Sequence, residues 1–572
     1  MSTSHGQTVN GAELLTRSLV RLGVEHVFNI PGLGLFPLVE AFYRHRDEMR
    51  YITALNETNL ALIANGYARA TGKPAFVNVY HASGTALAMM AVTTAWGENV
   101  PLVLTTTTSS RALIGRDQYA GVPRAVTEMS EQFVKWSAEV PSVDRIPEFL
   151  ERAFQIAGTA PYGPVHLAFP MDLWAEETTL PAEQAEAARP MVFAAAADAE
   201  GIERVESLLA ASERPILVAG GEVVRYGAID QLVALAEALG CPVLSEPYIA
   251  DLGFPTTHPQ YVGKLSANRD LVDKADVALL VGVELTESGL GPAFGFADGT
   301  VVVNTTTDAN ALRRQFRPDI GLVGHPHPTL ARLAAALSAD QATAQKRDAR
   351  LEATSAARRS HNETTETLRR ARWDEQNPLS IGRILDVLQR SMPADTVVVN
   401  HAGAAQLHLE LMLDVDDPSR YFGISGKASA QGWGGPAAIG IQLARPQQRV
   451  VAVLGDGGFQ FSSTCLYTAS RFSIPVIYLI LNNGGWRDIA SIARHSGNEA
   501  AAGEAEFGWS FTDPPIDHAA FARSLGMHGV QVGDAAGLDK ALAAAFASDA
   551  PTLIEIDNST ADVEDFFTLF TK

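Results

Sequence analysis

Short runs of Val, Ile and Leu alternate with longer Ala- and Leu-rich stretches along most of this chain. The runs lie at 75–79, 101–106, 215–220, 277–282, 300–304, 449–455 and 475–481. A strand that is apolar at nearly every position is buried on both faces, as happens when helices cover both sides of a parallel sheet. The alternation therefore predicts an α/β protein built from doubly wound parallel sheets.

Two changes in composition divide the chain. Residues 175–199 are rich in Ala, Glu and Pro, and residues 336–376 are charged and helical in pattern, and neither stretch has strand character. We predict three domains, at 1–185, 186–345 and 346–572, the last with a leading helical linker. The length of 572 residues agrees with this number, since domains usually have about 100–200 residues.

The outer two domains share a sequence pattern. Residues 60–106 and 437–483 each contain an Ala-rich helix, a Val-rich strand, a glycine turn, a second helix and a second strand opened by proline. The turn glycine and that proline are 17 residues apart in the first copy and 18 in the second. Such matching spacing indicates two copies of one fold on either side of a different middle domain.

Composition disfavours several classes of function. With 44 Lys and Arg against 65 Asp and Glu, the net charge is -21, and no dense basic patch occurs. We therefore expect no nucleic-acid or membrane partner. The two cysteines, Cys241 and Cys465, are too few for a disulfide framework or a thiolate metal cluster. The N-terminus does not resemble a signal peptide and no apolar run reaches about 18 residues, so we expect a cytoplasmic enzyme.

The most specific motif consists of two polar turns, each placed after a predicted strand. Gly455-Asp456-Gly457-Gly458 follows one strand, and Asn482-Asn483-Gly484 follows the next. Both turns are expected at the carboxyl edge of one parallel sheet, where such folds bind ligands. A carboxylate and an amide oxygen suit Mg²⁺, and the glycines let the backbone approach a diphosphate. No P-loop lysine accompanies the turn, so it is not a Walker A loop, and the absence of a G-x-G-x-x-G pattern disfavours a dinucleotide site here.

These turns resemble the GDG…NN signature of the thiamin-diphosphate-dependent enzymes, and the resemblance extends over nearly the whole chain. It implies that the first and third domains are related thiamin-diphosphate-binding folds, one for the pyrimidine ring and one for the diphosphate and Mg²⁺. It also implies that Asp456, Asn483 and the carbonyl of Gly485 bind the metal. Further cofactor contacts implied by the resemblance are Pro31, Gly32, Gly403, Ser429, Gln431, Gly455, Gly457 and Gly458.

The resemblance also requires a glutamate in the first domain against N1′ of the aminopyrimidine ring. Glu57 follows the predicted strand 51–55 and opens a helix, as the family glutamate does. Thiamin diphosphate acts through a carbanion at thiazolium C2, and a buried glutamate that shares its proton with the pyrimidine promotes its formation. The alternative role for Glu57 is stabilisation of the helix N-terminus. In the family this glutamate and the diphosphate site belong to different subunits, which implies a homodimer at least and commonly a homotetramer.

Within the family, residues 73–174 resemble benzoylformate decarboxylase most, and the general pattern also fits acetolactate synthases. Leu33 replaces a serine that follows the Pro-Gly turn, and an active-site histidine aligns with Tyr80, one place before His81. A second histidine, expected in the middle domain, is missing. Gln431 stands where an aliphatic residue usually supports the cofactor. These departures put the familiar route of aromatic 2-keto acid decarboxylation in doubt.

We therefore predict a thiamin-diphosphate- and Mg²⁺-dependent, non-oxidative 2-keto acid decarboxylase or carboligase that works through a C2-carbanion/enamine, with Glu57 and His81 as catalytic residues. The alternatives are an acetolactate synthase-like or acyloin-forming carboligase or lyase, an inactive regulatory homologue, and an NAD-binding oxidoreductase. Retention of Glu57, Asp456 and Asn483 together argues against the inactive homologue. The residues predicted to line the substrate pocket are Leu33, Tyr80, His81, His401, Trp486 and Ile489.

Overall fold

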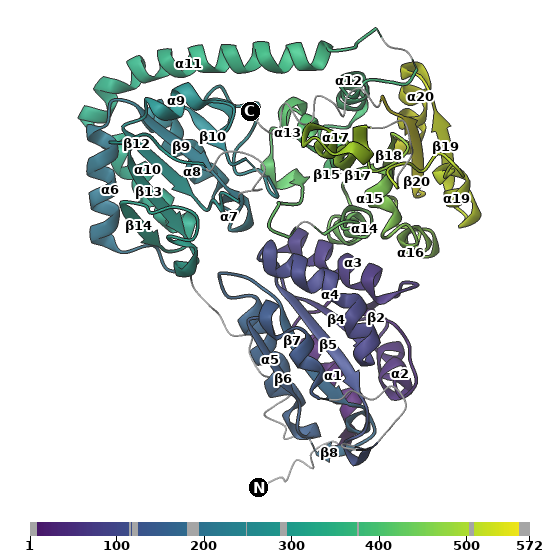
Figure 1. Cartoon of the computed structure of the whole chain (residues 1–572). Coiled ribbons are helices and arrows are strands. Elements are labelled where there is room, and N and C mark those ends of the chain that lie inside the picture. The colour runs from purple at the N-terminus through teal and green to yellow at the C-terminus, as the bar shows by residue number, and fades with distance from the viewer. Residues whose placement is uncertain are drawn as a thin grey trace. The chain divides into compact units, whose positions relative to one another are not determined.

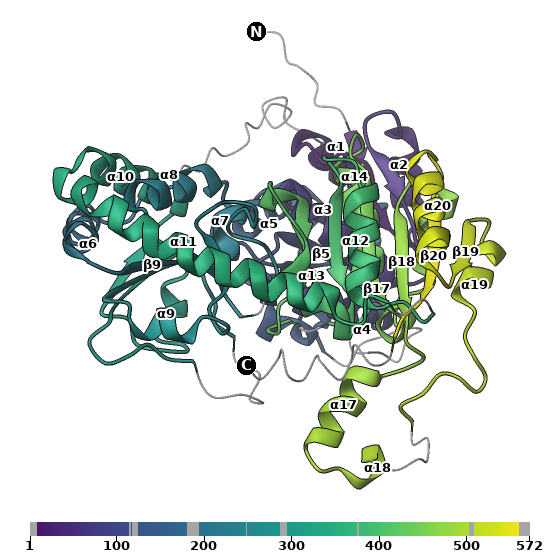
Figure 2. The same cartoon turned by 90° about the horizontal axis from the view of Figure 1, so that it is seen from above.

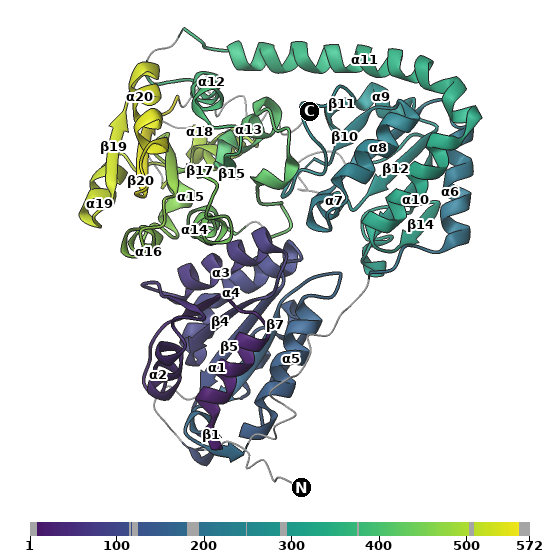
Figure 3. The same cartoon turned by 180° about the vertical axis from the view of Figure 1, so that it is seen from behind.

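The computed structural model describes residues 8–113, 116, 124–179, 194–247, 249–286, 294–374, 377–428, 430–502 and 508–559. The chain forms two compact units (Figures 1 and 3). Unit 1 comprises residues 1–193, 435–446 and 462–474. Unit 2 comprises residues 194–434, 447–461 and 475–572.

Unit 1 contains a six-stranded parallel sheet between two layers of helices. Its strand order is β3 (Arg50–Ile52), β2 (His26–Asn29), β4 (Ala75–Tyr80), β5 (Leu102–Thr108), β7 (Val165–Pro170) and β6 (Trp136–Glu139). One face packs against α1 (Gly11–Arg21), α2 (Phe36–Arg44) and α5 (Ile146–Ala157). On the other side, α3 (Glu57–Thr71) and α4 (His81–Gly97) pack on each other and on the sheet.

A short antiparallel pair adds to this domain. β1 (Thr8–Asn10) pairs with β8 (Glu177–Thr179), so the expectation that residues 175–199 lack strand character was wrong at their beginning. Three residues are too few for an alternating pattern to show in the sequence, and the pairing depends on a partner about 170 positions away. Residues 180–193 lie outside the described residues.

Unit 1 also includes helices from late in the chain, α14 (Gly434–Ala444) and α16 (Cys465–Arg471). α14 crosses α3 at van der Waals distance: a Cβ on Gly66 would lie 2.2 Å from the carbonyl oxygen of Ala437, and one on Gly440 would lie 1.9 Å from that of Ile63. Asn59 Nδ2 donates a hydrogen bond of 2.8 Å to Thr464. Glycine at both crossing points is therefore required for this packing.

Unit 2 contains two further parallel sheets. In the C-terminal domain the order is β16 (Tyr421–Phe422), β15 (Val397–His401), β17 (Val450–Gly455), β18 (Ile477–Asn482), β20 (Thr552–Asp557) and β19 (His528–Val532). In the middle domain it is β11 (Tyr261–Lys264), β10 (Val243–Ser245), β9 (Pro215–Ala219), β12 (Val277–Val281), β13 (Val301–Thr306) and β14 (Ile320–Val323).

The strand orders confirm the predicted duplication. Numbered along the chain, the strands of the unit 1 sheet and of the C-terminal sheet both run 2-1-3-4-6-5, whereas those of the middle sheet run 3-2-1-4-5-6. The three parallel sheets also confirm the predicted fold class. Their central strands are buried along almost their whole length, which explains the continuous apolar runs.

Helices cover these sheets within unit 2. The core of the C-terminal domain contains α12 (Ile381–Ser391), α13 (Gln406–Met412) and α20 (Ala535–Phe546). The core of the middle domain contains α6 (Ala199–Ala211), α8 (Ile229–Leu239) and α10 (Pro326–Ala339). The shorter helices are α7 (Gly221–Arg225), α9 (Arg269–Asp273), α15 (Asp456–Gln460), α17 (Arg487–His495), α18 (Glu499–Ala502) and α19 (His518–Ser524).

The predicted helical linker is α11 (Gln341–Arg370), a 30-residue helix that contacts helices of both domains in unit 2 (Figure 2). The Asp340 side chain accepts the Thr343 N–H at its N-terminus. A buried ion pair between Lys264 and Glu410 also joins the middle and C-terminal domains. Among the described residues, no helix combines the length and apolarity that crossing a bilayer requires.

The fold predicts a pH-dependent stability through His166 of β7. Its Nε2 lies 2.8 Å from Thr106 Oγ1 and its Nδ1 lies 2.7 Å from Ser130 Oγ. Burial lowers the pKa of His166 from 6.5 to about 3. The unfolded chain therefore takes up this proton first, and stability is lost as the pH falls from 6.5 toward 3. Between pH 6.5 and 5.5 we expect this histidine to cost about 1 kcal/mol, measured from urea unfolding midpoints.

The matched variants are His166→Gln, which removes the titrating ring, and His528→Gln at an exposed position. The first should flatten the dependence of unfolding free energy on pH, and the second should leave it unchanged. An equal slope in wild type and His166→Gln would contradict the assignment.

Candidate active site

Three neighbouring strands of the C-terminal sheet end at one edge. β15 and β17 are in register at His401 and Leu454, and β17 and β18 at Gly455 and Leu481. The turns that follow these strands line a cavity of about 400 Å³. Of the predicted site residues, the cavity contains His401, Gly403, Gln431, Gly455, Asp456, Gly457, Gly458, Asn483, Gly485, Trp486 and Ile489. Ser429 lies outside the described residues.

Asp456 and Asn483 supply the oxygen atoms that a cation would need. Asp456 opens α15, is 3% exposed, and accepts the Gly485 N–H at 2.9 Å. Burial raises the pKa of Asp456 to about 6, opposed by backbone hydrogen bonds that include those of Gly457 and Gly485. In the part of the chain that the structure describes, the buried Oδ1 of Asn483 has no hydrogen-bond partner. A buried acceptor left open beside a carboxylate fits a hard cation that takes oxygen ligands.

The Gly484-Gly485 turn requires glycine at both positions. Gly484 has φ +76° and Gly485 has φ +151°. A Cβ on Gly485 would lie 2.0 Å from the carbonyl oxygen of Trp509. That oxygen accepts the Trp486 N–H at 2.8 Å, so the turn is held against segment 508–511. This packing places the Gly485 N–H against Asp456.

The buried carboxylate of Glu555 orients the same turn through Asn482. Glu555 Oε1 accepts Asn482 Nδ2 at 2.7 Å and lies 3.1 Å from His518 Nδ1, while Oε2 accepts the Ala519 N–H. Asn482 Oδ1 in turn accepts the Gly484 N–H at 3.0 Å. Glu555 and His518 were not predicted as site residues, because nothing local to them in the sequence shows that their strand and helix lie beside β18.

Aromatic and amide side chains form the wall of the cavity. A Cβ on Gly457 would lie 2.7 Å from the Trp486 ring, whose centroid is 5.7 Å from that of Phe461. A Cβ on Gly458 would lie 3.1 Å from Gln431 Oε1. Both glycines therefore allow these side chains to approach the turn closely. Ile489 also lines the cavity, and its side chain is 49% exposed.

His401 offers the cavity a hydrogen-bond donor. Its Nδ1 accepts the Gly434 N–H at 3.1 Å. Burial lowers the pKa of His401 to about 4, so the ring is neutral near pH 7. A neutral imidazole that accepts at Nδ1 carries its proton on Nε2.

The cavity also contains a carboxyl group that the sequence analysis missed, that of Asp488. Its Oδ1 accepts the Ile489 N–H at 2.9 Å, and its Oδ2 lies 3.6 Å from the position of a Cβ on Gly403. Burial raises the pKa of Asp488. An aspartate in the first turn of a helix is usual as a partner for the helix dipole, so its sequence position gave no separate signal.

In unit 1, Glu57 lies just after β3 at the start of α3. Asn56 caps this helix by accepting the Asn59 N–H at 2.8 Å. A Cβ on Gly84 would lie 3.0 Å from Glu57 Oε1, so glycine at the start of α4 makes room for the carboxyl group. Glu57 is partly exposed in this unit.

Tyr80 ends β4 and His81 begins α4, beside the turn that follows β2. The two rings are 3.9 Å apart, and a Cβ on Gly32 would lie 2.8 Å from the Tyr80 ring. His81 is 2% exposed and has φ +56°, a left-handed conformation that is rare outside glycine. Pro31 is exposed, and Leu33 is 59% exposed. The predicted site residues of the first domain therefore lie together at the carboxyl edge of this sheet.

Comparison with known families agrees with the duplicated architecture. Models of thiamine pyrophosphate (TPP, thiamin diphosphate) enzymes match the chain in three parts: the N-terminal TPP binding domain over residues 9–129, the central domain over 202–333 and the C-terminal TPP binding domain over 401–556. The chain belongs to the thiamine pyrophosphate enzyme family.

Individual relatives match most of the chain. Benzoylformate decarboxylase of Pseudomonas aeruginosa is 30% identical over 552 residues, which are 95% of this chain and 98% of that protein. The acetolactate synthase isozyme 3 large subunit of Escherichia coli is 27% identical over 506 residues, 86% of each chain. The solved structure of a Rhodococcus jostii thiamine diphosphate-dependent 4-hydroxybenzoylformate decarboxylase has a TM-score of 0.83 at 25% identity and covers 96% of this chain and 99% of its own.

The packing of the Gly485 turn predicts the effect of one added methyl group. Gly485→Ala should displace the turn from Trp509 and remove the N–H donor from Asp456, because the added carbon would lie 2.0 Å from a backbone oxygen. We expect thiamin diphosphate affinity to fall by about 100-fold, measured by isothermal titration calorimetry. The control is Gly497→Ala, whose glycine also has a positive φ (+76°) but has nothing within 4 Å of the new carbon. Equal affinity in the two variants would contradict this role for the turn.

Proposed function

We propose that this protein is a thiamin-diphosphate- and Mg²⁺-dependent, non-oxidative decarboxylase or carboligase that acts on a 2-keto acid. The observation that carries the metal and diphosphate site is the open, buried Oδ1 of Asn483 in the same cavity as the carboxylate of Asp456. The relatives named benzoylformate decarboxylase and acetolactate synthase support the class of substrate.

The residues of the C-terminal domain suit the polar end of the cofactor. Asp456, Asn483 and the carbonyl of Gly485 would hold Mg²⁺, whose remaining positions suit diphosphate and water oxygens. Gly457 and Gly458 leave the backbone of the turn accessible to the diphosphate. Gly455, Gly403 and the exposed Gln431 line the same cavity.

When bound, thiamin diphosphate supplies a carbon nucleophile that adds to the keto carbonyl and accepts the electron pair left when CO₂ departs. The carboxyl group of Glu57 would hold and exchange a proton at N1′ of the aminopyrimidine ring. Pro31, Gly32, Tyr80 and His81 lie at the same sheet edge as Glu57, and His81 is proposed to take part in proton transfer to the substrate.

The residues that form the wall of the cavity suit contacts with the substrate. The Trp486 and Ile489 side chains would exclude water from an apolar substituent, while the Nε2 proton of His401 can donate to a carboxylate oxygen. Leu33 stands where the resembling decarboxylases carry serine, and leucine has no proton to donate. That loss favours transfer of the acyl unit to a second carbonyl compound as the second candidate outcome.

The proposed function is tested by incubating the holoenzyme with a panel of 2-keto acids, alone and with aldehyde acceptors, and by identifying products by mass spectrometry. We expect CO₂ with either a free aldehyde or an acyloin, and loss of product when EDTA removes Mg²⁺. A chain that retains the cofactor but gives no product with any pair would refute the proposed activity and favour an inactive homologue.

We further propose that Glu57 acts in the site of a second copy of the chain, in a homodimer or larger homo-oligomer. Glu57→Gln and Asp456→Ala should each inactivate the enzyme, because the first removes the ionisable group and the second a metal ligand. In mixed dimers one site carries both changes and the other carries neither. Coexpression of the two variants should therefore recover about a quarter of wild-type activity. The absence of any recovery in verified mixed dimers would place both groups in one subunit.

A further inference from the structure

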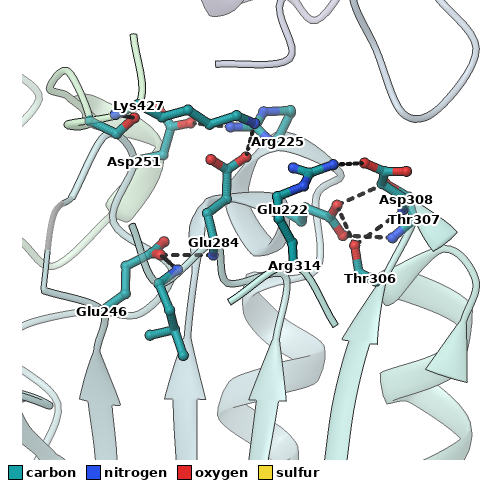
Figure 4. A network of polar contacts seen from close by, with 12 residues as sticks. Glu222, Arg225, Glu246, Asp251, Glu284, Thr306, Thr307, Asp308, Arg314 and Lys427 are labelled. Atoms are coloured by element: carbon teal, nitrogen blue, oxygen red, sulfur yellow. Dashed lines mark hydrogen bonds and ion pairs between the residues drawn. The ribbon is translucent and has the colours of Figure 1, made fainter. Parts of the chain in front are cut away.

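The middle sheet has a topological switch point between β9 and β12, the place where open α/β sheets usually bind ligands. In this chain the strands around that point are followed by acidic side chains, as Figure 4 shows. They are Glu222 after β9, Glu246 after β10, Glu284 after β12 and Asp308 after β13. Their contacts show which hydrogen-bond donors at this edge of the sheet are already bound.

Glu222 accepts hydrogen bonds from the residues at the end of β13 and just after it. Its carboxyl oxygens accept from Thr306 Oγ1 at 3.1 Å, from Thr307 Oγ1 at 2.8 Å and from the Thr307 N–H at 2.9 Å. Glu222 is 7% exposed, and burial raises its pKa. Gly282 makes this position possible, since a Cβ there would lie 2.2 Å from that of Glu222. The donors that would otherwise face a ligand after β13 are thus bound internally.

Glu246 does the same for the turn after β12. Its Oε2 accepts the N–H groups of Glu284 at 2.9 Å and Leu285 at 3.2 Å. Burial raises the pKa of Glu246 to about 8, so this group is mostly protonated at neutral pH. Glu246 therefore fixes the backbone of Glu284 without adding a full negative charge beside it.

The side chain of Glu284 extends to the C-terminal domain. Its Oε1 lies 3.2 Å from Lys427 Nζ, and the two side chains are 28% and 18% exposed. The neighbouring ion pair of Arg225 and Asp251, at 3.1 Å, stays within the middle domain (Figure 4). Lys427 belongs to the segment between β16 and α14, which also carries Gln431.

The start of that segment is held by two further contacts. The Gly423 N–H donates to the Ala250 carbonyl of the middle domain at 2.6 Å, and Gln406 Nε2 donates to the Ile424 carbonyl at 3.1 Å. Its far end brings Gln431 to the cofactor cavity. Residues 423–428 are therefore anchored on both the middle domain and α13, and Gln431 lies a few positions further along the chain in the cofactor cavity.

We propose that the Glu284–Lys427 ion pair is a positioning contact. Through this pair the switch point of the middle domain, where Glu222 and Glu246 already bind the backbone donors, sets the position of segment 423–428. The position of that segment in turn sets where Gln431 lies in the cofactor cavity. Neither residue of the pair touches the reacting atoms. This inference rests on the proposed function only for its effect on turnover; the effect on the segment itself is independent of it.

The test uses Lys427→Met, Glu284→Gln, the double variant and the conservative Lys427→Arg in the full-length protein. The control is Lys346→Met, which breaks an ion pair between α11 and Glu213 of the middle domain. Hydrogen exchange of the 423–428 amides is measured without cofactor, and thiamin diphosphate affinity by calorimetry. Each single variant should speed exchange in this segment and weaken cofactor affinity by about two- to five-fold. The double variant should be no worse than either single one, and Lys427→Arg should restore both values.

In turnover the single variants should lower kcat and leave KM for the keto acid unchanged, as expected for misplacement of the cofactor rather than loss of a substrate contact. The proposal is overturned if exchange and affinity match those of Lys346→Met, or if the two single effects add in the double variant. Failure of the proposed function would look different: wild type would bind the cofactor and release no product, while the exchange comparison would still decide the role of the pair.

Discussion

The hydrogen bond from the Gly485 N–H to the buried carboxylate of Asp456 joins the ends of two parallel strands, and the site is organised around it. A buried carboxyl group needs donors, and the backbone of a turn can supply them only if the turn comes close. That approach requires glycine at 484 and 485, the backbone contact with Trp509, and the chain of hydrogen bonds through Asn482 to Glu555. The apolar strands below hold both turns in register.

Much of the fold could be predicted because its signals are local. A strand buried on both faces leaves a continuous apolar run, and a turn at a ligand-binding edge leaves glycines beside a polar residue, so the place of Asp456 and Asn483 could be read from β17 and β18 alone. The duplication was visible because two copies of one topology keep similar spacings between helix, turn and strand. The same residues also allowed the family to be predicted from the sequence.

The rest depends on contacts between segments distant in the sequence. Nothing near Glu555 shows that it orients Asn482, 73 positions away, and nothing near His401 shows that the Gly434 N–H settles which ring nitrogen carries the proton. The role of Glu222 could not be predicted either, because its hydrogen-bond partners lie at the end of β13 and just after it, a strand that is distant in the sequence. The short strand β8 lacked any pattern of its own for the same reason.

The make-up of unit 1 has a consequence for how the protein is made on the ribosome. Its N-terminal part presents α3, whose packing against α14 and hydrogen bond to Thr464 need residues from 435–446 and 462–474. Translation of residues 194–434 must come first, which takes about 10–50 seconds at about 5–20 residues per second. Throughout that interval the close-packing surface at Ile63 and Gly66 is without its partner on the nascent chain. A translation pause or a premature stop before residue 435 would leave it uncovered, and such products are the ones we would expect chaperones to hold.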